Sequence, residues 1–222
     1  MSQWLVVGLG NPGPRYERTR HNVGFRALDE LVRRHNLPAW KGGKFGADTT
    51  SGVVVTPRGR ERTVLCKPME FMNLSGFAVQ RVAKFHDIPV DHIVVAHDEI
   101  DLDHGLVRVK TGGGHGGHNG LRSMIDQLGG NGFVRLRIGV GKPGPGAGSA
   151  DGGAAAARAA GNLGAAAGAA GKDVAGWVLA DFPAAQASSV DAMLARAADA
   201  LESVLGLGAG PTMNAFNALP RL

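Results

Sequence analysis

Residues 92–101 read HIVVAHDEID, a short apolar run rich in β-branched side chains that leads directly into polar and acidic residues. An apolar run of this length without alternation is typical of a strand that is buried on both faces. His97, Asp98 and Glu99 then fall at the carboxyl end of that strand, where open α/β sheets place their ligand sites. We therefore expect a buried central strand with a polar site at its end.

The segments on either side alternate between strand-like and helix-like patterns. A turn is predicted near Gly52 and a helix N-cap at Ser75. Strands interleaved with helices indicate an α/β fold with a largely buried central sheet. The predicted strands are 4–7, 45–55, 63–66, 92–96, 106–110 and 134–140, the predicted helices are 23–35, 75–86, 121–128 and 184–205, and 174–179 is predicted as a strand or extended segment.

Length and composition favour one domain over residues 1–222. The chain has a mass of 22.9 kDa and is 44% apolar, which is enough for a substantial core. Residues 144–172 interrupt the pattern, because 22 of these 29 residues are Gly or Ala and almost none is large enough to bury. We interpret them as a flexible insertion within that domain.

The charge distribution points to a polyanionic partner. Residues 1–62 carry 11 Lys and Arg against 5 Asp and Glu, so the whole net charge of +5 arises there. Such a basic region attracts phosphate, and nucleic acid is the commonest polyanion, although a merely solubilising surface is the alternative. With only 5% aromatic residues, a base-stacking platform is not evident.

Cellular location is predicted from cysteine content and hydropathy. The single cysteine, Cys66, cannot form an internal disulfide, and no basic-then-apolar leader precedes the first strand. No apolar stretch approaches the roughly 18 to 20 residues of a membrane helix. We expect a cytoplasmic protein without a membrane span, in which Cys66 is buried and inert.

The loop Gly8–Gly13, GLGNPG, matches the glycine pattern of dinucleotide-binding sites. That reading is disfavoured here, because Pro12 and Pro14 lack the N–H groups that would face a pyrophosphate. Helical periodicity also begins only near Val23, and Asp29 lies inside that helix and not at the end of a second strand.

His21 is the candidate general base. It falls at the junction of a loop and a helix, and histidine is the side chain best suited to accept a proton near neutral pH. A hydrogen bond from His21 to Asp98 would set the tautomer and stabilise the imidazolium, so that the pair could activate water. The alternatives are a capping His21 and an Asp98 that faces solvent.

Two further segments carry polar side chains at the ends of predicted elements. Residues 110–120, KTGGGHGGHNG, could approach a ligand or anion closely, whereas His115 and His118 lack the companions of a familiar metal site. In residues 67–76, KPMEFMNLSG, the amide of Asn73 suits a carbonyl or peptide backbone. Ser75 could be a nucleophile, but it does not stand in a G-x-S-x-G elbow.

Taken together, these segments resemble the bacterial-type peptidyl-tRNA hydrolase family. The order and spacing of the blocks make the resemblance specific, although residues 144–172 look longer and richer in Ala and Gly than the family's connection. The matching blocks are GLGNPGPRYERTRHNVGF, KPMEFMNLSG, HDEIDL, KTGGGHGGHNGLRS and RLRIGVGKP, followed by WVLADF.

The resemblance implies hydrolysis of the ester between a peptide and the 3′-terminal ribose of tRNA, which frees tRNA for reuse in translation. It also implies a twisted mixed β-sheet flanked by helices, no metal or organic cofactor, and a monomer without an obligate protein partner. The implied site residues are catalytic His21 and Asp98, substrate-binding Asn11, Tyr16, Asn73, Asn119 and His118, and tRNA phosphate-binding Lys110 and Arg137.

A second hypothesis is a non-catalytic RNA-binding protein of the same fold. The two hypotheses differ in whether the histidine, its acidic partner and the asparagines are needed. All of them are present here, which favours the enzyme.

Overall fold

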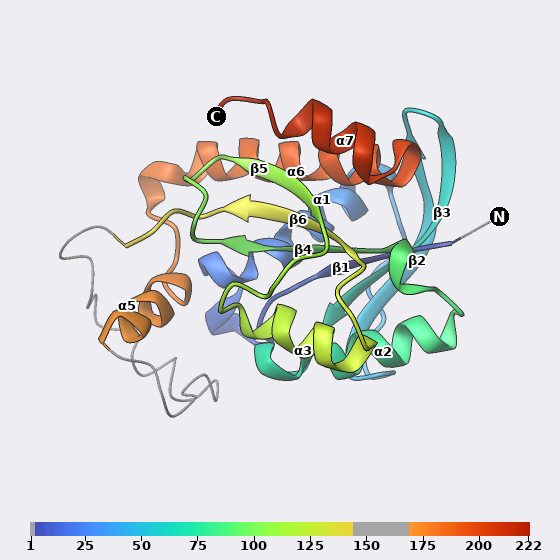
Figure 1. The fold of residues 1–222 in the computed structure, drawn as a ribbon, viewed down its shortest axis with the longest axis horizontal. Helices are drawn as coiled ribbons and strands as arrows, with labels where there is room; N and C mark the ends of the chain where they lie inside the picture. The colour runs from blue at the N-terminus through green and yellow to red at the C-terminus, as the bar shows by residue number, and fades with distance from the viewer. Residues whose placement is uncertain (1–2, 144–168) are drawn as a thin grey trace.

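The computed structural model describes residues 3–143 and 169–222, so most of the Ala/Gly-rich segment 144–172 lies outside the described residues. Six strands form one mixed sheet in the order β2-β3-β1-β4-β6-β5 (Figure 1). The strands are β1 (Trp4–Gly8), β2 (Ala47–Thr56), β3 (Gly59–Pro68), β4 (Ile93–Glu99), β5 (Val107–Thr111) and β6 (Val134–Gly139). The helices are α1 (Val23–His35), α2 (Ser75–Phe85), α3 (Asn119–Leu128), α5 (Ala169–Val178), α6 (Ala187–Leu207) and α7 (Ala209–Phe216).

Helices cover both faces of the sheet, which confirms the predicted α/β fold. Val94 and Ala96 of β4 pack in one core with α1 and α6, whereas Ile93 and Val95 pack in a second core with α2 and α3. Figure 1 shows α6 and α7 on one side of the sheet and α2 and α3 on the other. Because β4 is covered twice, every position of its apolar run is buried.

The four central strands run in the same direction. β1 pairs in parallel with β3 and β4, and β4 pairs in parallel with β6, while β2 and β5 are antiparallel to their neighbours. The carboxyl ends of β1, β3, β4 and β6 therefore meet at one edge of the sheet. The loops that follow β1 and β3 are brought to the acidic end of β4.

Two sequence predictions near the strands were wrong. Gly52 does not form a turn but lies inside β2, where a Cβ would come within 2.7 Å of Leu37 Cδ2. Ser75 does not cap α2, because the preceding 3₁₀ turn, Met72–Leu74, runs into the helix and Leu74 occupies the N-cap position. The periodicity of the sequence does not reveal either of these packing constraints.

The carboxyl-terminal region departs further from the sequence prediction. Residues 174–179, predicted as a strand or extended segment, include the end of helix α5. Arg20 donates to the carbonyl group of Trp177 in the last turn of α5 and to that of Ala180 just after the helix. Helix α7 was not predicted. After it, the Asn217 amide pairs with both the N–H and the C=O of Val109, at 2.8 and 2.9 Å, and so covers the edge of β5. Within the described residues, none of the helices is long and apolar enough to cross a membrane.

Helix α1 lies unusually close to the strands it covers. A Cβ on Gly24 would lie 2.4 Å from the Ala96 carbonyl oxygen and 2.6 Å from that of Leu9, and one on Gly8 would lie 2.5 Å from the Gly24 carbonyl oxygen. Backbone atoms of β4 and α1 cannot move aside as a flexible side chain can. These two glycines therefore set how near the start of α1 approaches the end of β4.

We predict that Gly24→Ala lowers the free energy of unfolding by about 3 kcal/mol, because the added methyl group must push two backbone segments apart. Urea unfolding measures the change. The control is Gly210→Ala in α7, where a Cβ would meet nothing within 4 Å. That variant should range from no change to a gain of about 1 kcal/mol, and equal stabilities of the two variants would contradict the prediction.

Candidate active site

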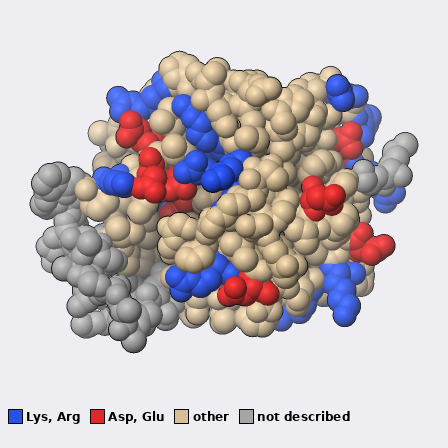
Figure 2. All heavy atoms as spheres, viewed as in Figure 1, with Lys and Arg blue, Asp and Glu red and all other residues tan. Residues whose placement is uncertain are grey.

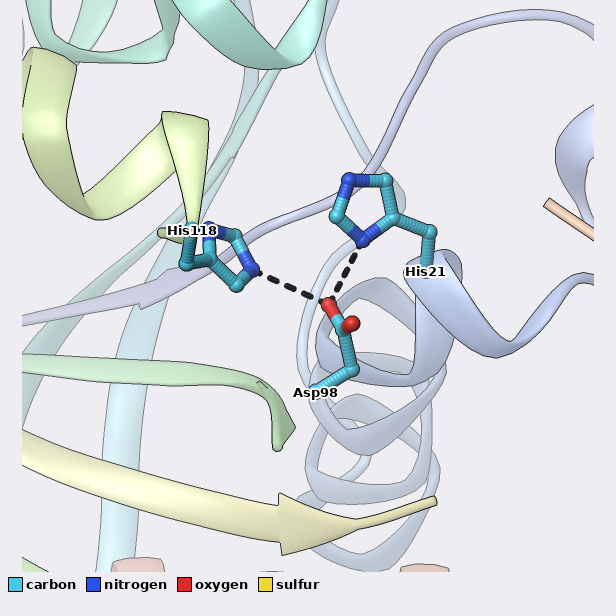
Figure 3. A group of neighbouring side chains, drawn as sticks. All are labelled: His21, Asp98 and His118. Atoms are coloured by element: carbon cyan, nitrogen blue, oxygen red, sulfur yellow. Dashed lines mark hydrogen bonds and ion pairs between the residues drawn. The ribbon is translucent and has the colours of Figure 1, made fainter. Parts of the chain in front are cut away.

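His21 and Asp98 lie together, as the sequence analysis expected. His21 is in the 3₁₀ turn Arg20–Asn22 that precedes α1, and Asp98 is the penultimate residue of β4. Nδ1 of His21 lies 2.7 Å from Oδ1 of Asp98, and both residues are buried (Figure 3). The second ring nitrogen of His21 points away from the carboxylate in this view.

His118 contacts the same carboxylate oxygen. Its Nε2 lies 3.0 Å from Asp98 Oδ1, and its Nδ1 accepts hydrogen bonds from the backbone N–H groups of Gly120 and Leu121 at the start of α3. Because Nδ1 must accept, the proton of the neutral ring is on Nε2, which donates to Asp98. The start of α3 thereby determines the tautomer of His118.

Two imidazoles keep the Asp98 carboxylate ionised. Burial would by itself raise the pKa of Asp98, but the nearby His21 and His118 rings and their hydrogen bonds lower it well below its ordinary value. An ionised Asp98 accepts the Nδ1–H of His21 and leaves the Nε2 lone pair of His21 free to take a proton. This is the arrangement that general-base catalysis requires.

The same three side chains could be read as a metal site, since their ligand atoms lie within 4.8 Å of one another. The tautomer of His118 argues against this. A metal on Nε2 would leave the proton of a neutral ring on Nδ1, where it would face the N–H groups of Gly120 and Leu121. Metal-bound histidines instead donate their second N–H to an acceptor, so the geometry fits a hydrogen-bonded group better than a metal centre.

His118 has two roles, as the N-cap of α3 and as the hydrogen-bond donor to Asp98. We predict that the variants His118→Asn and His118→Ala distinguish these two roles. Asparagine is a favoured N-cap, so His118→Asn should retain most of the stability, whereas His118→Ala should lose about 1 kcal/mol more. Both variants lose the donor to Asp98, so both should show the same shift of the acidic limb in the pH profile of kcat. Recovery of the wild-type pH profile in His118→Asn would contradict this role.

Asn11 is a buried residue that is held by hydrogen bonds to two other segments. Its backbone N–H donates to Asn22 Oδ1 and its own Oδ1 accepts from the N–H of Met72, both at 2.9 Å. The Asn11 Nδ2 group is buried and has no hydrogen-bond partner among the described residues. Asn73, in the turn before α2, is exposed, and Asn119 is the half-buried first residue of α3.

Three other residues of the sequence analysis are buried. Tyr16 packs against Val178 and Leu179, and its carbonyl oxygen accepts hydrogen bonds from the N–H and the hydroxyl of Thr19. The hydroxyl of Ser75 is buried without a hydrogen-bond partner among the described residues, so no base activates it as a nucleophile. Cys66 lies in the core, where burial raises the pKa of its thiol to about 12, in agreement with an inert side chain.

Lys110 and Arg137 lie on one face of the β5–β6 pair. Lys110 is opposite Arg135 and Arg137 is opposite Arg108 in the antiparallel register, so all four side chains start from the same face. We call these four residues the basic face. Figure 2 shows Lys and Arg side chains gathered over β5 and β6.

Sequence reasoning missed Arg20, the buried residue directly before His21. Its Nη1 donates to the carbonyl groups of Trp177, Ala180 and Asp181, and its guanidinium lies 3.7 Å from the centre of the Trp177 ring. These contacts hold the end of α5 against the loop of the candidate base. No local pattern could have revealed them, because the partners are about 160 residues apart.

His97 was also missed, since a histidine beside Asp98 has no fixed meaning in sequence. Its ring meets that of His118 edge-on, with 5.2 Å between ring centres, and its Nδ1 donates to the Asp98 carbonyl oxygen. Burial, and to a lesser extent the nearby His118, lowers the pKa of His97 from 6.5 to about 3. His97 therefore stays neutral near neutral pH.

We predict that this buried neutral histidine makes stability depend on pH. The unfolded chain protonates His97 near pH 6.5 but the folded protein does so only near pH 3, so the free energy of unfolding should fall as pH drops through this interval. His97→Asn should reduce the slope between pH 4.5 and 6.5 by up to about 1.4 kcal/mol per pH unit. Urea unfolding at several pH values measures it. The half-buried His92, replaced by Asn, is the control and should leave the slope in place.

Comparison with known proteins agrees with this geometry. A sequence profile described as peptidyl-tRNA hydrolase matches residues 5–152. The peptidyl-tRNA hydrolase of Rhodococcus opacus is 43% identical over 213 residues, which is 95% of each chain, and that of Cutibacterium acnes is 41% identical over 97% of this chain and 98% of its own.

Solved structures also match this chain to peptidyl-tRNA hydrolases. The crystal structure of peptidyl-tRNA hydrolase from Acinetobacter baumannii has a TM-score of 0.76 and 36% identity, and the match covers 97% of this chain and 94% of that one. An α/β sheet that presents paired imidazoles on one carboxylate fits the class of general-base hydrolases. The chain belongs to the peptidyl-tRNA hydrolase family.

Proposed function

We propose that this protein hydrolyses the ester between a peptide and the 3′-terminal ribose of tRNA, with His21 as the general base. The observation that carries the proposal is the hydrogen bond from His21 Nδ1 to the buried Asp98 carboxylate. It leaves Nε2 of His21 as the proton acceptor, which is the group that a water-activating site needs. Family membership agrees with this substrate.

The reaction has two proton transfers. Nε2 of His21 takes a proton from water as the water oxygen adds to the ester carbonyl carbon. When the tetrahedral intermediate collapses, the imidazolium returns this proton to the departing 3′ oxygen of the ribose. The products are the peptide carboxylic acid and tRNA with a free 3′ hydroxyl, and Asp98 stabilises the imidazolium between the two steps.

Amide groups of Asn11, Asn73 and Asn119 hold the peptide in this proposal. The unpartnered Nδ2 of Asn11 supports this, because a buried donor without an acceptor is costly unless a ligand supplies one. A donor placed beforehand in a buried site can also stabilise the oxyanion of the tetrahedral intermediate. Tyr16 and His118 complete the proposed set of substrate-binding residues.

We predict that His21→Ala lowers kcat by about 10²- to 10⁴-fold, the usual contribution of a positioned general base, while affinity for tRNA stays within about twofold. The measurement is release of the acyl group from N-blocked aminoacyl-tRNA, with the free-amine form as a comparison substrate. Turnover near the wild-type rate would remove His21 from the mechanism.

Ser75→Ala serves as the matched control for the same assay. It should retain full activity, because its hydroxyl touches neither His21 nor Asp98 in any described hydrogen bond. A large loss of activity on removing Ser75 would instead favour a serine-type esterase.

Lys110 and Arg137 bind tRNA phosphate in this proposal. Lys110 is exposed at the end of β5, and the Arg137 side chain is partly exposed on the same face. Lys110→Ala and Arg137→Ala should each weaken tRNA binding and reduce the slope of log affinity against log salt by about 1. Binding titrations at several salt concentrations test this, and an unchanged slope would contradict the phosphate assignment.

The proposal extends to the setting in which the enzyme works. Residues 1–222 act as one domain, as a cytoplasmic monomer that needs neither metal nor organic cofactor, and residues 144–172 form its insertion. The non-catalytic RNA-binding alternative predicts tRNA binding without release of the acyl group. The complete His21–Asp98 pair favours the enzyme.

A further inference from the structure

Among the described residues, the basic face has one ion pair with a carboxylate, between Arg137 and Glu99 at the end of β4. Nε of Arg137 donates to Oε2 of Glu99 at 3.0 Å, and Oε1 of Glu99 accepts the backbone N–H of Asp101 at 3.1 Å. The Glu99 side chain is 18% exposed and that of Arg137 is 27% exposed. Both oxygens of the carboxylate are thus engaged, and one edge of the guanidinium is held in place.

The two neighbouring arginines are held differently. Arg108 donates to the carbonyl groups of Val107 and Phe216, and Arg135 donates to those of Gly113 and Gly114 in the glycine loop. Carbonyl oxygens orient a guanidinium without cancelling its unit charge. Among the arginines of the basic face, only Arg137 has a described ion-pair partner.

We propose that Glu99 limits how tightly the basic face holds tRNA and so favours release of the free tRNA product. This inference rests on the proposed contact of Arg137 with phosphate. Glu99 acts in two ways: it fixes the edge of Arg137 that carries Nε, so that the Nη groups face a phosphate, and its negative charge repels that phosphate.

The consequence concerns release of the product. Hydrolysis of the ester separates the peptide from tRNA. The phosphates of tRNA are the same before and after the reaction. A basic face without an opposing charge would hold substrate and free tRNA equally tightly, and free tRNA would then compete with the next substrate. Glu99 weakens both interactions at the group where phosphate binds.

The test compares Glu99→Gln with Asp101→Asn in the full-length enzyme. Glutamine removes the charge and keeps one acceptor oxygen, which can still accept the hydrogen bond from Nε of Arg137. The contact with the backbone N–H of Asp101 is lost, because the amide NH2 group donates and does not accept. Asp101 is the matched control, because its carboxylate lies two residues away and pairs with Lys142 at 2.7 Å, where both side chains are more than half exposed.

Glu99→Gln should bind deacylated tRNA about three- to tenfold more tightly at low salt, and the inhibition constant of deacylated tRNA should fall by the same factor. The gain should shrink as salt rises, because the site is partly exposed. Asp101→Asn should change either constant by less than about twofold. An unchanged or weaker affinity in Glu99→Gln, or an equal gain in Asp101→Asn, would overturn the inference.

Two further variants separate the possible failures. Glu99→Ala removes both charge and acceptor, so it should bind tRNA less tightly than Glu99→Gln; equal affinities would contradict the orienting role. Arg137→Ala tests the underlying assignment. If it leaves affinity and salt slope unchanged, the phosphate contact itself is wrong, whereas a loss in Arg137→Ala with no gain in Glu99→Gln contradicts only the role of Glu99.

Discussion

One buried carboxylate oxygen, Oδ1 of Asp98, accepts hydrogen bonds from two imidazole rings. An ionised carboxylate is very costly to bury alone, and it is tolerated when donors surround it. The chain must therefore bring the turn before α1 and the start of α3 to the end of β4. The contacts between these three segments determine the tautomers of His21 and His118. In the His21 tautomer, Nε2 has no proton and can act as the proposed base.

The sheet topology makes this meeting possible. Parallel strands β1, β3 and β4 deliver three different loops to one edge, and the Asn11–Met72 hydrogen bond joins two of these loops. Glycines at the start of α1 and at the end of β1 allow the helix to approach within the reach of an imidazole. The site is built on strand ends and helix starts, which hold side chains more rigidly than long loops do.

Charge is distributed differently from what the composition suggests. The excess of Lys and Arg lies in residues 1–62, yet several of these side chains are committed to structural contacts. Arg20 is buried against the end of α5, and Arg34 pairs with Glu30, Asp199 and Glu202 between α1 and α6. The basic face instead comes from β5 and β6, where the antiparallel register places four cations on one side.

Part of this architecture could be predicted from local sequence. The apolar run of β4 and the periodicity of α1 predicted a strand and a helix correctly. A strand that is buried on both faces has a continuous apolar run, whereas a helix that is buried on one face has apolar residues at every third or fourth position. Two helical segments, residues 169–178 and 209–216, escaped prediction because their short apolar stretches lack a clear period and their ends are held by distant residues.

The sequence by itself determined the fold class, the resemblance to the family and which side chains can carry the chemistry. Only the tertiary structure decided that His118 donates to Asp98, that His97 stays neutral and that Glu99 pairs with Arg137. The physical reason is that residue type sets what a group can donate or accept, whereas protonation state and charge balance depend on burial and on partners that lie far away in the chain.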